Sequence, residues 1–350
     1  MRTRDAEAIG RAFANAVDGF PRERAPLILG HFDADGLASI ALIARAMERA
    51  GRPAETRIVG KGENAWSDAM RAELAARRPG GLIVADLGVR SGALLAGVPT
   101  ILVDHHVPTG APDGALVLSG NGVEPEPTSA LIAYWCASGL APAEDLLWLA
   151  AIGLIGDMAV DAGFPELAEA QARYGKTALR NAVALINAPR RTAAADAGPA
   201  LSLLLTCDSP KELLSGVHAD TARLHAAKAE VACELESARR VPPNVRGEVA
   251  LIRFDSPCQI HPLIAQQWRG RLRDRIVIAA NGGYRPGWVH FAARSASGRD
   301  LIAFLDAHRP KGADGHYGNG HRQATGGALP HPVWNEFISK LGFPEEQVES

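Results

Sequence analysis

Short apolar runs of strand length recur in the first third of the chain and alternate with helix-like segments. Residues 25–30, 81–85 and 100–103 are apolar runs typical of buried strands. Residues 37–50 and 67–78 carry apolar side chains at helical spacing. A further helix is expected over 6–18 and a further strand over 55–59. Strands that alternate with helices predict βαβ units and a parallel α/β sheet.

The rest of the chain continues as helices and then returns to strands. Helical patterns are expected over 128–136, 144–155, 166–206 and 220–240. The last helix is highly charged and ends at Pro242-Pro243, which is typical of an interdomain connector. A second α/β region follows, with strands expected over 249–254, 275–280 and 288–295 and helices over 261–268 and 300–308. We therefore predict domains over 1–215 and 247–350, joined by a helical connector over 216–246.

Acidic and imidazole side chains follow three of the predicted strands. They are His31, Asp33 and Asp35 after the first, Asp86 after the second, and Asp104, His105 and His106 after the third. The carboxyl ends of parallel strands share one edge of a sheet, so these side chains should converge there. So many carboxylates would repel one another unless cations lie between them. Carboxylate and imidazole donors together suit a divalent transition metal.

Simpler interpretations of the same residues are turn and cap formation. Asp33 and Asp35 are expected on an irregular loop, where an Asp often caps the following helix. Asp86 could cap a turn after its strand. Asp157 follows the apolar helix over 144–155, where the helix dipole disfavours a negative charge, or it is an exposed turn residue.

A glycine-rich stretch over 311–327 follows the last predicted helix. Glycine lets backbone N–H groups approach an anion closely, so His321 and Arg294 could together bind a phosphate. The alternative is a flexible surface loop. Arg294 and Ser295 end the strand predicted over 288–295.

Composition limits the alternatives. The chain of 350 residues has 47% hydrophobic and 22% charged residues and a net charge of −2, which argues against a generally basic nucleic-acid-binding surface. The four cysteines lack the spacing of a zinc site or a disulfide framework, so a reduced cytoplasmic location is expected. No apolar run follows the charged N-terminus and none is long enough for a membrane span, so no membrane association is predicted.

Four signals in order resemble the DHH phosphoesterase superfamily: His31-Phe-Asp-Ala-Asp-Gly36, Asp86 in Val-Ala-Asp-Leu-Gly, Asp104-His-His106, and Gly156-Asp157. The C-terminal Arg294-Ser295 and the segment Gly320-His321 to Gly326-Gly327 resemble the DHH-associated domain of RecJ-type exonucleases and nanoRNases. The glycine segment departs from the family pattern because Asn319 stands where a glycine is usual. The resemblance covers nearly the whole chain and implies a Rossmann-like DHH domain followed by a smaller α/β domain.

The resemblance also implies roles for individual residues. Asp33, Asp35, Asp86, His105 and Asp157 would hold two metal ions, usually Mn²⁺ with Mg²⁺ as the alternative, and Asp86 would bridge them. Asp104 would orient a ligand or support it from behind, and His106 would face the scissile phosphate. His31 is expected as a further metal ligand or as a phosphate contact. In the second domain, the substrate contacts would be Arg294, Ser295, Gly320, His321, Gly326 and Gly327.

The function expected from these residues is metal-dependent hydrolysis of phosphodiester bonds in single-stranded DNA or short oligonucleotides, as in RecJ. One alternative is a nanoRNase, cyclic-dinucleotide or 3′-phosphoadenosine 5′-phosphate hydrolase. Another is an inactive scaffold or replication-complex partner that kept the fold. The expected partner is single-stranded nucleic acid or a nucleotide, and a homodimer is left open as the assembly state.

Overall fold

The computed structural model describes residues 1, 5–110, 112–313 and 317–349, with the side chains of 319–321 left aside. The chain forms two compact units. The first contains residues 1–190 and 195–226, and the second contains residues 191–194 and 227–350. Each unit has its own sheet and its own hydrophobic core.

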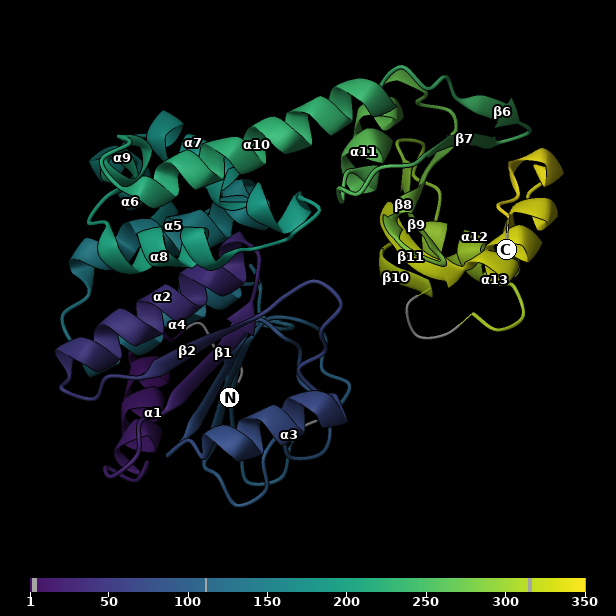
Figure 1. The fold of residues 1–350 in the computed structure, drawn as a ribbon. Coiled ribbons are helices and arrows are strands. Elements are labelled where there is room, and N and C mark those ends of the chain that lie inside the picture. Colours follow the sequence, from purple (N-terminus) through teal and green to yellow (C-terminus); the bar gives the residue numbers. More distant parts are fainter. Residues whose placement is uncertain (2–4, 111, 314–316, 350) are drawn as a thin grey trace. The chain divides into compact units, whose positions relative to one another are not determined.

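The first unit is built on a five-stranded parallel sheet of order β2-β1-β3-β4-β5 (Figure 1). Its strands are β1 (Leu27–His31), β2 (Glu55–Val59), β3 (Leu82–Ala85), β4 (Thr100–Asp104) and β5 (Leu116–Ser119). Its helices are α1 (Ala6–Asp18), α2 (Ala34–Arg49), α3 (Asp68–Arg77), α4 (Ser129–Leu140), α5 (Leu147–Gly156), α6 (Pro165–Tyr174), α7 (Lys176–Ile186), α8 (Gly198–Thr206) and α9 (Pro210–Leu214). The 3-10 turns are η1 (Glu144–Leu146), η2 (Ala159–Ala162) and η3 (Pro189–Arg191).

Alternating strand residues bury both faces of this sheet. Ile28 and Ile83 pack into a large core with α1, α2, α4 and α5. Leu29 and Val84 point the other way and pack against α3 through Met70 and other apolar side chains. Figure 1 shows α3 on one side of the sheet and α1, α2 and α4 on the other. This is the doubly wound α/β arrangement that the alternating pattern predicted.

The structure corrects two details of this unit. Asp33 caps α2 by accepting a hydrogen bond from the Gly36 amide, so the helix begins at Ala34 and Asp35 lies in its first turn rather than on an irregular loop. The strand β5 was not predicted. It is a short edge strand of four residues, and its sequence Leu-Val-Leu-Ser carries little pattern.

The second unit contains a mixed six-stranded sheet of order β10-β11-β9-β8-β7-β6. Its strands are β6 (Asn244–Arg246), β7 (Val249–Phe254), β8 (Ile276–Arg285), β9 (Trp288–Ser295), β10 (Tyr317–His321) and β11 (Ala324–Pro330). Its other elements are α11 (His261–Arg271), α12 (Leu301–Ala307), α13 (His331–Lys340) and η4 (Pro344–Glu346). The long helix α10 (Ala219–Ala238) contains the boundary between the two units.

The glycine-rich stretch was expected as a loop, but much of it forms the antiparallel pair β10 and β11. Glycine is poor in strands, yet a close backbone contact requires it here. A Cβ atom on Gly326 would lie 2.4 Å from the carbonyl oxygen of Phe291 on β9. Gly326 is therefore required for close packing between strands and is not part of a flexible loop.

Among the described residues, no helix has both the length and the apolar character needed to cross a bilayer.

Candidate metal centre

The predicted ligands of the first unit meet at the topological switch point of the sheet, where the strand order reverses. From β1 the chain moves outward to β2 and then returns to the other side of β1 as β3. Ligands of open α/β sheets bind at the carboxyl ends of strands at such a switch point. His31 ends β1, and Asp86 follows β3 directly. The topology thus brings together side chains that lie 55 positions apart in the sequence.

One group of potential ligands joins β1 to β3. His31, Asp33 and Asp86 each offer a ligand atom, and these atoms all lie within 4.8 Å of one another. Nδ1 of His31 lies 3.1 Å from Oδ1 of Asp33 and 3.6 Å from Oδ2 of Asp86. These distances leave room for a cation among the three side chains.

A second group joins α2, β4 and the end of α5. Asp35, His105 and Asp157 also offer ligand atoms within 4.8 Å of one another. Nε2 of His105 lies 3.1 Å from Oδ2 of Asp157, 3.9 Å from Oδ2 of Asp35 and 3.6 Å from Oδ1 of Asp86. The opposite ring nitrogen of His105 lies 3.7 Å from Oε1 of Glu126. Asp157 is the C-cap residue of α5, as its position after the apolar helix suggested.

Asp86 lies between these two groups. Its Oδ2 faces His31, whereas its Oδ1 faces His105 and His106. A third ligand-like group, Asp86 with His105 and His106, shares the same carboxylate. Asp86 has φ of 61°, a left-handed conformation that aspartate tolerates better than most residues and that recurs at functional sites. Its carboxylate is therefore placed to serve two neighbouring cations.

Asp104 and His106 occupy different environments. Asp104 is buried, and its two oxygens accept hydrogen bonds from the amides of Gly88 and His106 at 2.7 Å. Its Oδ1 also lies 3.2 Å from Nδ1 of His106. Asp104 thus orients the loop after β3 and the His106 ring, while the ring itself is 53% exposed. The role of His106 toward a scissile phosphate stays a prediction.

The fully buried Asp35 carboxylate is held by the first turn of α4. Its oxygens accept hydrogen bonds from the amides of Ser129 at 2.9 Å and Ala130 at 3.0 Å. The positive end of a helix dipole stabilises a carboxylate in this position. Gly153 on α5 leaves the space for it, since a Cβ atom there would lie 2.3 Å from Oδ1 of Asp35.

Burial and mutual repulsion dominate the electrostatics of the centre. Burial, reinforced by Asp86 and Asp157, raises the pKa of Asp35. Burial also raises the pKa of Asp86. Burial lowers the pKa of His105, but Asp157, Asp35 and Asp86 outweigh it and raise that pKa to about 10. For His31, burial is likewise outweighed, here by Asp33 and Asp86, and the pKa rises to about 10.

These shifts show that ionisation of Asp35 and Asp86 is costly in the absence of other cations. For Asp33, burial is outweighed by His31 and Arg190, which lower the pKa of that carboxyl. Asp35 and Asp86 are buried carboxylates that resist ionisation, while two imidazoles beside them hold protons strongly. A divalent cation would replace those protons and remove the cost of the buried negative charges. The donor set of His31, Asp33, Asp35, Asp86, His105 and Asp157 therefore fits divalent metal ions.

The predicted substrate contacts of the second unit lie on β9, β10 and β11. Nη1 of Arg294 donates hydrogen bonds to the carbonyls of Ala293 and Thr325, and the side chain is partly exposed. Ser295 is fully buried, and its hydroxyl lies 2.9 Å from that of Ser297. Gly320 and His321 pair with β11 through their backbones, and Gly326 and Gly327 pair with β9. The side chain of His321 lies outside the described residues.

Several residues near the centre were not identified from the sequence. Ser129 donates its hydroxyl to Oδ1 of Asp86 at 2.9 Å, and Oδ1 of Asn187 accepts the Ala34 amide at 3.1 Å. Arg190 lies 3.4 Å from Oδ2 of Asp33. Ser129 could have been suspected from the predicted helix start after Pro127. No local pattern marks Asn187 or Arg190, because their partners lie more than 150 positions away in the sequence.

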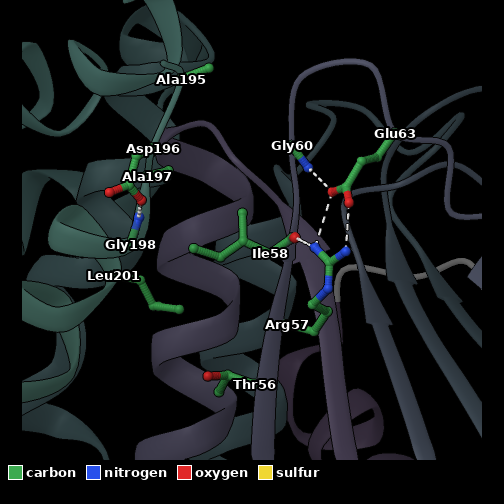
Figure 2. A pocket seen from close by; sticks show the side chains of 10 residues that line it. All are labelled: Thr56, Arg57, Ile58, Gly60, Glu63, Ala195, Asp196, Ala197, Gly198 and Leu201. Atoms are coloured by element: carbon green, nitrogen blue, oxygen red, sulfur yellow. Dashed lines mark hydrogen bonds and ion pairs between the residues drawn. The ribbon is translucent and has the colours of Figure 1, made fainter. Parts of the chain in front are cut away.

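A separate cavity of about 330 Å³ lies beside the edge strand β2 (Figure 2). Its lining combines β2 and the following loop with residues 195–201. Glu63 and Glu73 both bind the guanidinium of Arg57 at this edge. None of its described lining residues is a predicted site residue, so the cavity does not add to the metal centre.

No protein-family model and no curated protein sequence matches the chain. Solved structures do. A manganese-bound exonuclease RecJ is 20% identical with a TM-score of 0.68, and the match covers 99% of this chain and 96% of that one. RecJ of Thermus thermophilus in complex with Mn²⁺ is 21% identical with a TM-score of 0.69, over 100% of this chain but 56% of that one.

The DHH domain of a member of a ribosomal protein family is 15% identical with a TM-score of 0.64, over 96% of this chain and 89% of that one. At these identities the likeness establishes the architecture. Together with the parallel sheet and the mixed second sheet, it confirms the predicted fold class: the chain shares the fold of these RecJ and DHH-domain structures.

Proposed function

We propose that the protein is a metal-dependent phosphodiesterase that hydrolyses single-stranded DNA or short oligonucleotides. The observation that carries this proposal is the shared carboxylate of Asp86. It faces one ligand group through Oδ2 and the other through Oδ1, so six donor side chains form two adjoining sites. Two adjoining metal sites are common in enzymes that transfer phosphoryl groups to water. Mn²⁺ is the proposed ion because imidazole and carboxylate donors suit it better than Mg²⁺.

When bound, two divalent ions would lower the pKa of an attacking water and neutralise charge on the phosphoryl oxygens. The protein supplies the geometry for this reaction. Asp104 holds the His106 ring through backbone and side-chain contacts, so an exposed imidazole is aimed outward beside the ligands. Asp35 is held by two helix amides and cannot swing away from its site. His106 is thus proposed to contact the scissile phosphate.

The substrate proposal is supported by the RecJ likeness and by basic side chains of the second unit. Arg294 lies on β9. One of its guanidinium nitrogens, Nη1, donates to two backbone carbonyls, and the guanidinium has two further nitrogens. Arginine recognises phosphate through such paired donors. We propose that Arg294 and the β10–β11 segment contact the phosphates of the substrate. Oligoribonucleotides and cyclic dinucleotides are alternative substrates for the same hydrolysis of phosphodiester bonds.

The deciding experiment is product analysis with purified protein and Mn²⁺. The substrates are 5′-labelled single-stranded DNA of about 30 nucleotides, longer than a typical single-strand binding site, RNA dinucleotides, a cyclic dinucleotide and 3′-phosphoadenosine 5′-phosphate. Stepwise release of mononucleotides from the DNA is the expected result. Cleavage of only the small substrates would move the assignment to a nanoRNase or cyclic-dinucleotide hydrolase. Binding of Mn²⁺ without cleavage of any substrate would contradict an enzymatic role and favour a scaffold.

A further inference from the structure

Arg190 reaches the candidate metal centre from a segment with no predicted chemistry. It lies in η3, belongs to the first unit and is 157 positions from Asp33 in the sequence. Its Nη1 lies 3.4 Å from Oδ2 of Asp33, and its side chain is only 21% exposed. Burial of a charged guanidinium beside a candidate metal ligand costs free energy unless its N–H groups are hydrogen-bonded. The partners of Arg190 therefore bear on its role.

The hydrogen-bonding capacity of Arg190 is mostly unused. A guanidinium has five N–H donors in a planar fork. The contact to Asp33 is a long one that uses a single nitrogen. The Nε atom is buried and has no hydrogen-bond partner among the described residues. A buried guanidinium in this state is suited to an anionic ligand that accepts two hydrogen bonds in parallel, as a phosphate group does.

A purely supporting role for Arg190 would be to orient Asp33. That work is already done by other groups. Oδ1 of Asp33 accepts the Gly36 amide at 3.1 Å as the cap of α2, and it lies 3.1 Å from Nδ1 of His31. The carboxylate is therefore oriented without Arg190, and the unused donors of the guanidinium call for another acceptor.

We propose that Arg190 contacts a non-bridging oxygen of the substrate phosphoryl group at this centre. This inference rests on the proposed phosphodiesterase function and adds a residue to it. In the reaction, the attacking water loses a proton and its oxygen forms a bond to phosphorus, the bond from phosphorus to the leaving alcohol oxygen breaks, and that oxygen takes up a proton. Arg190 transfers no proton. Its fixed positive charge stabilises the negative charge on the phosphoryl oxygens in the transition state.

The test uses the full chain with Arg190→Ala and Arg190→Lys. Arg49→Ala is the matched control, since this partly buried arginine pairs with Asp145 away from the centre. Three quantities are measured: kcat and KM for the preferred substrate, the affinity for Mn²⁺ without substrate, and the affinity of the Mn²⁺-saturated protein for inorganic phosphate. Titration calorimetry provides both affinities.

For Arg190→Ala we expect kcat/KM to fall by about 10²–10³-fold, as when one preorganised donor is removed. The affinity for inorganic phosphate should fall by about 10- to 100-fold, which corresponds to one charge-assisted contact. The affinity for Mn²⁺ should stay the same or increase, because a positive charge beside a ligand is removed. Arg190→Lys should recover only part of the loss, because lysine lacks the planar fork.

Two results would overturn the inference. Weaker Mn²⁺ binding with unchanged phosphate affinity would mean that Arg190 only positions Asp33. Unchanged values for all three quantities would mean that it does neither. If the wild-type protein hydrolyses none of the substrates, the proposed function fails, but the phosphate measurement still decides whether Arg190 binds a phosphate.

Discussion

Two clusters of ionisable side chains, one in each unit, differ in the sign of their charge. The carboxyl edge of the first sheet gathers four aspartates around His31 and His105, and the neighbouring acids raise the pKa of both imidazoles to about 10. In the second unit, His261 lies on α11 near His290, Arg191 and Arg294. Here burial, reinforced by these basic neighbours, lowers the pKa of His261 well below its ordinary value.

The comparison shows that the pKa of the same residue type moves in opposite directions in the two units. Neighbouring carboxylates raise the pKa of an imidazole, whereas burial and neighbouring basic groups lower it. Buried charge of one sign is costly unless a ligand of the other sign is bound. Under the proposed function, the first cluster would bind cations and the second would bind the phosphates of the substrate.

The largest effect is expected for Asp86, on which the acidic cluster depends. Asp86→Asn should reduce activity to background, because it removes the carboxylate that both ligand groups share. It should also remove most of the Mn²⁺-induced stabilisation, which for one site amounts to about 2.7 kcal/mol at a hundredfold excess over the dissociation constant. Thermal unfolding with Mn²⁺ and with chelator measures this.

Without metal, the same variant should be at least as stable as the wild type, because a buried carboxylate that resists ionisation has been removed. Asp145→Asn is the control, since Asp145 pairs with Arg49 outside the centre. Activity in Asp86→Asn comparable to wild type would eliminate the two-metal arrangement.

A smaller effect is expected for Arg294 in the basic cluster. Arg294→Ala should raise KM by about tenfold with little change in kcat, because a phosphate contact away from the reacting atoms contributes mainly to binding. Raised salt should weaken the wild-type interaction more than that of the variant. Steady-state kinetics at two salt concentrations check this, with Arg246→Ala, which pairs with Glu345, as the control.

Since Nη1 of Arg294 also binds two carbonyls, the unfolding free energy must be measured alongside. A loss of stability with unchanged KM would mean that Arg294 supports β9 and β11 rather than the substrate.

The smallest effect concerns stability and leaves metal binding untouched. The pKa of His261 is lower in the folded state than its ordinary value of 6.5, so the unfolded chain binds more protons below that pH. Stability should therefore fall as the pH drops below 6.5, by up to about 1.4 kcal/mol per pH unit from this residue. His261→Leu should flatten this dependence in urea unfolding between about pH 7 and about pH 5. An unchanged slope would show that His261 is not the group that titrates.

Much of the fold was accessible from the sequence because its elements carry strong local patterns. The strands β1 to β4 were predicted, as were the helices α1 and α3 with the cap residue Ser67. The short edge strand β5 and the pair β10–β11 were missed. These strands are stabilised by pairing with neighbouring strands rather than by a local pattern. Glycines such as Gly326 favour a loop prediction, because the close contact that requires them is made with a distant strand.

The sequence by itself determined which residue types end the strands, and the parallel βαβ pattern implied that these ends would meet. The resemblance of its motifs to a known family then implied His31, Asp33, Asp35, Asp86, His105 and Asp157 as candidate metal ligands. Only the tertiary structure decided how these side chains are grouped and supported. The division of ligands into two groups around Asp86, the helix amides on Asp35 and the arrival of Arg190 all depend on contacts between distant segments. Local sequence patterns report backbone preference and burial, whereas such long-range contacts form only when the sheet and its helices pack.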